Sequence, residues 1–98
     1  MFVGALTLDI LLGDVRSLKQ KRSVVRPIVA ELQRKFSVSV AETGEQELYR
    51  RSEIGVAVVA STAAHCSDVL NNCERLVAGR PEIELLSARH RLFGREEE

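Results

Sequence analysis

The sequence predicts an α+β fold in which a four-stranded antiparallel sheet carries two helices on one face. Three observations predict it. The 98 residues suffice for one hydrophobic core but not for two. The apolar positions switch between the two-residue period of strands and the 3.6-residue period of helices, and the order strand, helix, strand occurs twice. We therefore expect a single domain over residues 1–98, with its ordered core at residues 2–92.

The first strand is predicted at residues 2–12, where apolar and polar side chains alternate. Its apolar face carries leucine and isoleucine, whereas Thr7 and Asp9 point to the other side. Gly13 then interrupts the pattern, and Ser17 stands where the N-cap of a helix is expected.

The first helix is predicted at residues 18–35. Its apolar positions fall within about 100° of arc, the width of a stripe that faces a core: Leu18, Val25, Ile28, Val29, Leu32 and Phe36. Pro27 costs about 3 kcal/mol in a regular helix interior, so the alternative is a helix that begins at Pro27 after a loop over residues 17–25. We favour one bent helix, because the stripe passes residue 27 without a change of phase.

Two further strands are predicted at residues 37–41 and 54–60, separated by a polar turn over residues 42–47. The strand at residues 54–60 is apolar on both faces, which is typical of a strand in the middle of a sheet.

The second helix follows, with Ser61 or Thr62 as its N-cap. Gly79 and Pro81 mark its end. Its inward positions are spaced by three and four residues and are Cys66, Val69, Leu70, Cys73, Leu76 and Val77.

The last strand is predicted at residues 82–92, with a bulge or a strand end at residues 86–88. Residues 95–98 are expected to form a frayed charged tail. The complete order of elements is that of a ferredoxin-like βαββαβ sandwich. Right-handed crossovers place the first and third strands at the centre of its sheet, and function is then expected in the long polar loops or on the free sheet face.

The cysteines and histidines indicate neither a disulfide nor a metal site. Cys66 and Cys73 lie seven residues apart in the second helix, about 10.5 Å along its axis, which is farther than a disulfide spans. They are expected to be small core residues. His65 and His90 have no cluster of further ligands around them in the sequence, so we expect no metal and no cofactor.

The charge composition is balanced, with 14 Lys and Arg against 14 Asp and Glu. Bulk charge therefore predicts no affinity for nucleic acids or membranes. No apolar run approaches the roughly 20 residues of a membrane span, and the N-terminus lacks the pattern of a secretory signal. We expect a cytoplasmic protein without a membrane partner.

The balanced total conceals a basic segment between Arg16 and Lys35. Seven Lys and Arg residues accompany a single acid there, which gives the segment a charge of +6 and the rest of the chain −6. Three of the cations fall within about 60° of one another on the predicted helix, a ridge typical of a surface that contacts phosphate. The candidate nucleic-acid-binding residues are Arg16, Lys19, Lys21, Arg22 and Arg26.

Two other interpretations of this segment remain open. A charged helix face is often only solvated, and it is also suited to a protein partner with an acidic surface. The chain has three Phe and one Tyr; Phe2, Phe36 and Tyr49 are expected to lie at least partly in the core, which leaves little for base stacking. Contact with a nucleic acid is therefore expected through its shape or its backbone.

No catalytic site is predicted. Glu42, Glu45 and Glu47 cluster beside Gly44, which indicates a solvated turn, and neither a histidine nor a nucleophile accompanies them. Small phosphatases of this fold class bind an anion in the loop after the first strand. Here that loop supplies Arg16 but no glycine-rich cradle, and the asparagines lie mid-helix, so we predict that the protein is not an enzyme.

Three runs of the sequence, SLKQKRSVV (residues 17–25), FSVSVAE (36–42) and IGVAVV (54–59), resemble the bacterial YlxP-like family, a short domain of unknown function. The resemblance covers residues 2–92, and Tyr49 departs from it where the family often has tryptophan. It implies a ferredoxin-like fold and a bacterial cytosolic protein without an assigned enzymatic activity. Genes of the family often lie near those of transcription-termination, translation-initiation and ribosome-binding factors, which implies association with RNA or the ribosome.

The leading hypothesis is a non-catalytic module that docks on structured RNA or a ribosomal particle through the five basic residues. The alternative is a self-associating structural or regulatory module without nucleic-acid binding. In that case the free sheet face or residues 54–60 would form a homodimer across a two-fold axis.

Overall fold

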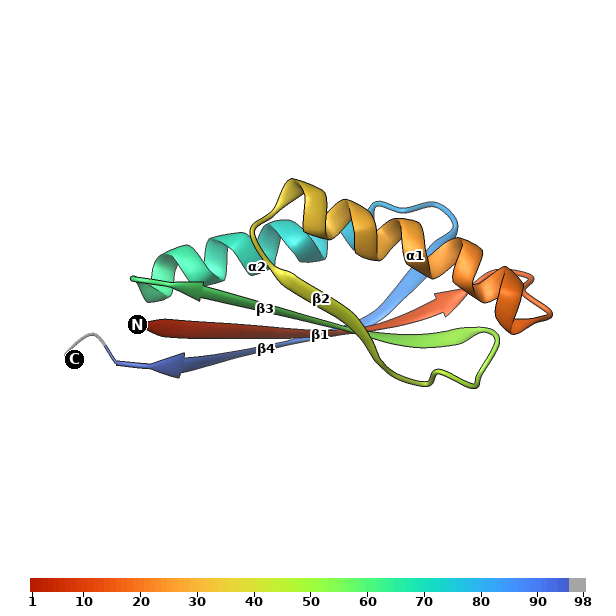
Figure 1. The fold of residues 1–98 in the computed structure, drawn as a ribbon, viewed down its shortest axis with the longest axis horizontal. Helices are drawn as coiled ribbons and strands as arrows, with labels where there is room; N and C mark the ends of the chain where they lie inside the picture. Colours follow the sequence, from red (N-terminus) through yellow and green to blue (C-terminus); the bar gives the residue numbers. More distant parts are fainter. Residues whose placement is uncertain (96–98) are drawn as a thin grey trace.

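The computed structural model describes residues 1–95. Its elements, in chain order, are β1 (Phe2–Leu12), α1 (Leu18–Lys35), β2 (Ser39–Gly44), β3 (Arg51–Ala60), α2 (Ala63–Ala78) and β4 (Ile83–Gly94) (Figure 1). The strands form one antiparallel sheet in the order β2-β3-β1-β4, with β1 and β3 at its centre. Both helices lie on one face of this sheet, so the predicted ferredoxin-like βαββαβ sandwich is confirmed.

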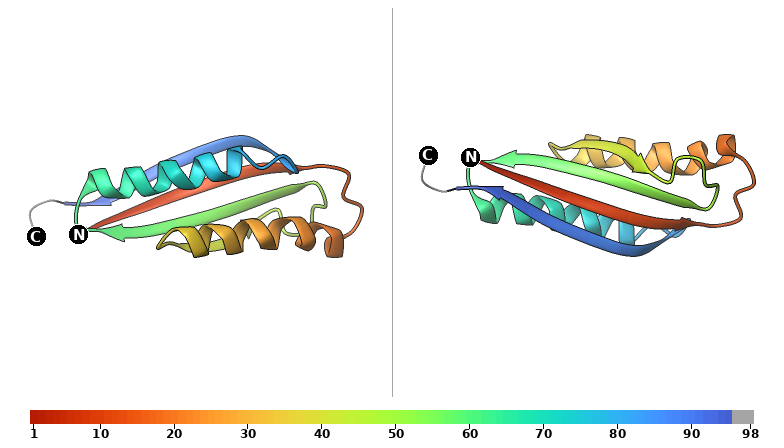
Figure 2. Two further views of the ribbon diagram at one scale, coloured as in Figure 1. Left: turned by 90° about the horizontal axis from the view of Figure 1, so that it is seen from above. Right: turned by 90° about the horizontal axis from the view of Figure 1, so that it is seen from below.

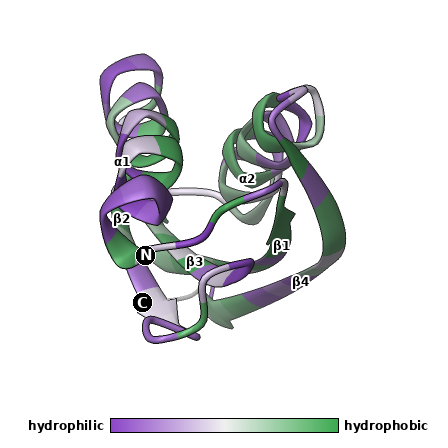
Figure 3. Cartoon of the chain, turned by 90° about the vertical axis from the view of Figure 1, so that its right-hand side faces the viewer, coloured by the Kyte–Doolittle hydropathy of each residue, from purple (hydrophilic) through white to green (hydrophobic). Residues whose placement is uncertain are grey.

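The core lies between the helices and the sheet. Alternate residues of β1 are buried from Phe2 to Leu12, as the two-residue period predicts. Seen from above, α1 lies over the β2 side of the sheet and α2 over the β4 side (Figure 2). Figure 3 shows that the hydrophobic side of each helix faces the sheet and the hydrophilic side faces outward.

α1 begins and ends as predicted. Ser17 is its N-cap, and the side-chain oxygen accepts a hydrogen bond from the backbone N–H of Gln20 at 3.1 Å. The helix passes through Pro27 and ends at Lys35, so the alternative start at Pro27 is wrong. Ser23 and Pro27 are both exposed, so water is able to bind the Ser23 carbonyl, which lacks the N–H of residue 27 as a donor.

β2 and β3 both extend into the region predicted as a turn. β2 runs to Gly44 instead of ending at residue 41, and β3 begins at Arg51 instead of residue 54. The predicted turn is therefore wrong for residues 42–44, because their polar side chains find partners in the structure. Thr43, for example, donates its hydroxyl hydrogen to Glu53 Oε2 at 2.8 Å across the strands. The turn itself occupies residues 45–50.

β4 contains the predicted bulge. Its register with β1 shifts between Asp9 and Ile10, which lie opposite Ser87 and Leu85, so Leu86 is the extra residue. β4 continues to Gly94, beyond the predicted end at residue 92. Of the predicted tail at residues 95–98, residues 96–98 lie outside the described residues.

α2 packs closely against the sheet. Thr62, and not Ser61, caps the helix by accepting from the backbone N–H of His65 at 3.1 Å, and Gly79 follows its last turn as predicted. A Cβ at Gly4 of β1 would lie 2.8 Å from Leu70 Cδ1 of α2. Glycine is therefore needed at this crossing for the close approach of helix and strand.

Candidate nucleic-acid interface

The basic face of α1 consists of Lys19, Arg22 and Arg26. These residues lie three and four positions apart and therefore project from neighbouring positions of the helix surface. All three are exposed, and together with Ser23 and Pro27 they line a shallow hollow of about 380 Å³. The structure thus brings three of the five candidate residues together.

Among residues 1–95, no carboxylate forms an ion pair with these three cations. The last turn of α1 differs, because Arg34 and Lys35 lie 3.7 and 3.6 Å from Glu31 Oε2. The other carboxylate oxygen of Glu31 lies 2.7 Å from Arg80. Positive charge is therefore neutralised at the end of α1 and left unpaired on the basic face.

Arg16 lies just ahead of α1 and contacts its own neighbours. Its Nε is 3.2 Å from Asp14 Oδ1, and its backbone N–H donates to Gln20 Oε1 at 2.7 Å. The side chain is 81% exposed, and an ion pair at such a surface contributes at most about 1 kcal/mol. A phosphate is therefore able to displace Asp14 from Arg16.

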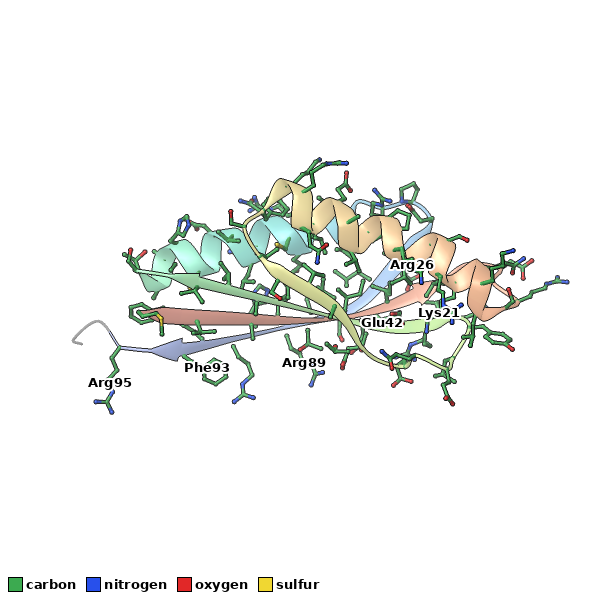
Figure 4. The ribbon with its side chains drawn as sticks, in the orientation of Figure 1. Lys21, Arg26, Glu42, Arg89, Phe93 and Arg95 are labelled. Atoms are coloured by element: carbon green, nitrogen blue, oxygen red, sulfur yellow. The ribbon has the colours of Figure 1, made fainter. Side chains whose placement is uncertain are left out.

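Lys21 does not belong to the basic face, and the expectation that it is exposed with the other cations is wrong. Its side chain is 3% exposed and extends between α1 and the sheet (Figure 4). Nζ lies 3.0 Å from Glu42 Oε2 and donates to the backbone carbonyl of Glu45 at 2.5 Å. The signal was present in the sequence, because residue 21 follows Leu18 by three positions and precedes Val25 by four, which places it within the apolar stripe.

Glu42 is not the solvated turn residue that was predicted. Besides contacting Lys21, its carboxylate accepts a hydrogen bond from Ser52 Oγ at 2.6 Å. Glu45 and Glu47, in contrast, are exposed in the turn. The predicted acidic cluster is thus divided into one residue that stabilises the fold and two that face water.

A second hollow, of about 350 Å³, lies between the basic face and β2. Arg22 and Arg26 border this hollow as well as the first one. Its apolar lining comes from Val25, Val29 and Ala30 of α1. The two arginines therefore form a ridge between two depressions, and an extended anion has access to them from either side.

A second group of cations, not predicted from the sequence, lies on the open sheet face. Arg89, Arg91 and Phe93 alternate along β4 and share one side of it; Figure 4 shows Arg89 and Phe93 pointing away from the helices. The guanidinium carbon of Arg91 lies 4.9 Å from the centre of the Phe93 ring. Arg89 lies 3.6 Å from Glu53. The two-residue spacing in the sequence was the signal for this group.

The aromatic residues are placed only partly as predicted. Phe2 is buried and Phe36 is partly buried against the core. Tyr49 is 48% exposed, so its predicted place in the core is wrong. The turn at residues 45–50 holds it outside the layer between helices and sheet, where it lines an open hollow of about 450 Å³ together with Leu48.

Cys66 and Cys73 are buried and unpaired, as expected of small core residues. Burial raises the pKa of the Cys73 thiol to about 11. His90 Nε2 lies 2.6 Å from Glu74 Oε1. Within residues 1–95, no three His, Cys, Asp or Glu side chains are grouped so as to hold a metal. No helix in the same part of the chain is long and apolar enough to cross a membrane.

These features define the class of the protein: a ferredoxin-like α+β domain whose first helix presents a basic face that no carboxylate of residues 1–95 neutralises. The same fold is found in a de novo designed protein with ferredoxin fold, solved by solution NMR. It matches with a TM-score of 0.56 at 13% identity and covers 97% of this chain and 88% of the designed one.

The chain belongs to the family described as "Protein of unknown function (DUF503)", whose model matches residues 3–90. It is 32% identical over 91 residues to "Uncharacterized protein YlxP" of Bacillus subtilis (strain 168), a match that covers 93% of this chain and 99% of that protein. The resemblance inferred from the three sequence runs is thereby confirmed.

Proposed function

We propose that the protein is a non-catalytic bacterial module that docks on structured RNA or a ribosomal particle in the cytoplasm. Lys19, Arg22 and Arg26 contact phosphates. Arg16 contacts a further phosphate, which displaces its exposed ion-pair partner Asp14. One observation carries the proposal. In a chain of zero net charge, the basic face holds three exposed cations without a carboxylate partner among the described residues.

The chemistry of the basic face suits the nucleic-acid backbone better than the bases. Long Lys and Arg side chains on a helix surface reach phosphate oxygens, and such contacts position a protein without reading sequence. Base reading in RNA depends largely on aromatic stacking, but no aromatic side chain lines either hollow beside the basic face. The expected ligand is therefore a folded RNA that is recognised by its shape.

The experiment measures binding of the protein to purified ribosomal subunits and to a duplex RNA over a range of salt concentrations. Each phosphate contact with a duplex contributes about −0.9 to the slope of log affinity against log salt. The three contacts of the basic face therefore contribute about −2.7 to the slope, or a loss of about 40-fold between 50 and 200 mM salt, and Arg16 adds at most about −0.9 more. The triple variant K19Q/R22Q/R26Q should lose this slope and most of the affinity.

A matched control is the variant R34Q/K35Q/R75Q, which removes the same number of charges from exposed positions outside the basic face. It should keep the wild-type affinity apart from a small general charge effect. Equal losses in both variants, or wild-type binding by K19Q/R22Q/R26Q, would reject the basic face as the interface. If the protein still binds ribosomal components after nuclease has removed their RNA, the partner is instead a protein with an acidic surface.

A further inference from the structure

The open face of the sheet carries an apolar strip along its two central strands. Five residues of β1 and the five paired with them on β3 point away from the helices. Six of these ten are apolar or glycine: Val3, Ala5, Leu11, Gly55, Ala57 and Val59. An antiparallel sheet with one wet face usually presents polar residues there. The composition therefore indicates that a second layer covers this face.

Charge on the open face is divided between its two ends. Arg91 lies opposite Ala5, toward the end where β1 begins and β4 finishes. Asp9, Glu53 and Glu84 lie toward the other end, where Arg51 accompanies them. Arg89, paired opposite Thr7, stands between the two groups. A partner that matches this face must therefore place acidic residues opposite the Arg91 end and basic residues opposite the end with Asp9 and Glu84.

Exposed apolar side chains also lie at both ends of the open face. At the end with Arg91, Val59 and Phe93 are 63% and 46% exposed. At the acidic end, the turn at residues 45–50 projects beyond the sheet on the side away from the helices (Figure 1). Its Leu48 and Tyr49 are about half exposed and line the hollow of about 450 Å³. Each end of the open face thus carries an apolar group that no other segment of residues 1–95 covers.

We infer that two copies of this chain pack with their open sheet faces together, related by a two-fold axis that crosses the strands near Thr7. The rotation reverses the strand direction. It therefore brings the end with Val59 and Phe93 of one copy over the end with Leu48 and Tyr49 of the other, and symmetry repeats the contact. Arg91 of each copy then lies over the Asp9 end of its partner, so that opposite charges meet twice.

The size of the open face suits a stable dimer. The molecule extends 50 × 21 × 19 Å, and the strands run along its long axis (Figure 2). Standard protein interfaces bury roughly 800 Å² on each partner. A face with sides of 50 and 19 Å provides an area of this order.

A nucleic acid is the less favourable occupant of this face. The strands place three cations and three carboxylates on it: Arg51, Arg89, Arg91, Asp9, Glu53 and Glu84. Arg89 is already close to Glu53, and Arg91 lies over the Phe93 ring. Arg95, just beyond β4, points to the same side (Figure 4), so the described residues leave this face with only a small excess of positive charge. Such a face gives phosphates little attraction, whereas a second copy meets complementary charges at both ends.

The test is analytical ultracentrifugation of the protein without nucleic acid, over micromolar to hundreds of micromolar concentrations. The wild type should sediment as a dimer. The variant F93K should raise the dissociation constant about tenfold or more, because it places a charge in the apolar contact. Leu92 supplies the matched control, because it is 48% exposed on the same strand but lies on the helix side, opposite Gly4. L92K should leave the dimer intact.

A charge exchange tests the orientation of the two copies. R91E and D9R should each weaken the dimer, because each places like charges together at both symmetric contacts. An equimolar mixture of the two variants should restore it as a heterodimer, since each subunit then carries the charge that its partner's substitution requires. Circular dichroism establishes that all variants keep the fold.

Three results would overturn the inference: a wild type that remains monomeric at the highest concentration, equal dissociation by F93K and L92K, or a mixture of R91E and D9R that stays monomeric. RNA on the open face would appear as a monomer whose affinity for RNA falls with R91E. Failure of the dimer leaves the basic face untouched, because the two proposals concern different sides of the molecule and different measurements.

Discussion

Lys21 joins three elements through a single buried side chain. Its ammonium group contacts the Glu42 carboxylate of β2 and the carbonyl of Glu45, where the turn begins. Glu42 in turn accepts from Ser52 of β3. A buried ion pair gives little advantage over an apolar pair of similar volume, but breaking it is costly because one charge is left without its partner. Lys21 and Glu42 are therefore expected to depend on each other.

We predict that K21M lowers the free energy of unfolding by about 3 kcal/mol. The further substitution E42Q should recover part of this loss, because it removes the unpaired charge and keeps an oxygen that accepts from Ser52. Urea denaturation of the two variants and the wild type measures both effects. A K21M/E42Q protein that is less stable than K21M would contradict the pairing. Since Lys21 is buried, K21M should also leave the salt dependence of RNA binding unchanged.

Cys73 predicts a pH dependence of stability. Burial raises the pKa of its thiol from 9.0 to about 11, so the folded protein holds the proton more tightly than the unfolded chain. The stabilisation is complete below pH 9 and is lost as the pH rises toward about 11. Unfolding of wild type and C73A between pH 8 and 11 measures it. The wild type should lose more stability than C73A across this range, and parallel curves would contradict the assignment.

At the scale of elements, regular periodicity determined what the sequence could predict. β1, α1 and α2 were placed within a residue or two because their apolar positions repeat without interruption. The end of β2 was missed because Glu42 and Thr43 are polar, and the partners that keep them in the strand come from distant segments. The place of Lys21 within the apolar stripe was visible in the sequence, but the distant partners that let a lysine be buried there were not. In each case an ion pair or hydrogen bond to a distant segment stabilises a polar side chain at a position where the periodic pattern expects an apolar one.

Pro27 is the one irregular residue of α1, and it predicts a gain in stability on substitution. P27A restores the backbone donor that the helix interior lacks and removes the clash of the ring with the preceding turn. The free energy of unfolding should rise by about 1–2 kcal/mol, less than the full cost of proline in a helix, because the unfolded chain also becomes more flexible. P81A, outside the helices, is the control and should bring no such gain. A decrease for P27A in thermal or urea unfolding would show that the proline conformation is needed.

At the scale of the whole molecule, the two proposed surfaces lie on different sides. The basic face belongs to α1, on the helix layer, and the proposed dimer contact belongs to the open face of the sheet. A dimer would therefore present two basic faces outward. Two sites on one particle raise the apparent affinity for an RNA that reaches both. The charge spacing along α1 was enough to predict the basic face from the sequence. The contacts on the open face were not predictable in the same way, because they depend on the strand register, which the sequence pattern does not determine at the bulge.

The burial of Lys21 also makes the chain suitable for chemical footprinting with amine-acylating reagents. Its lysines are Lys19, Lys21 and Lys35. Lys19 lies on the basic face and Lys35 is exposed beyond it, whereas the reagent cannot reach Lys21 in the folded chain. A labelled sample therefore provides its own internal standards for mass spectrometry. The ratio of acylated Lys19 to acylated Lys35 reports the occupancy of the basic face, and the amount of acylated Lys21 reports the fraction of molecules that had unfolded.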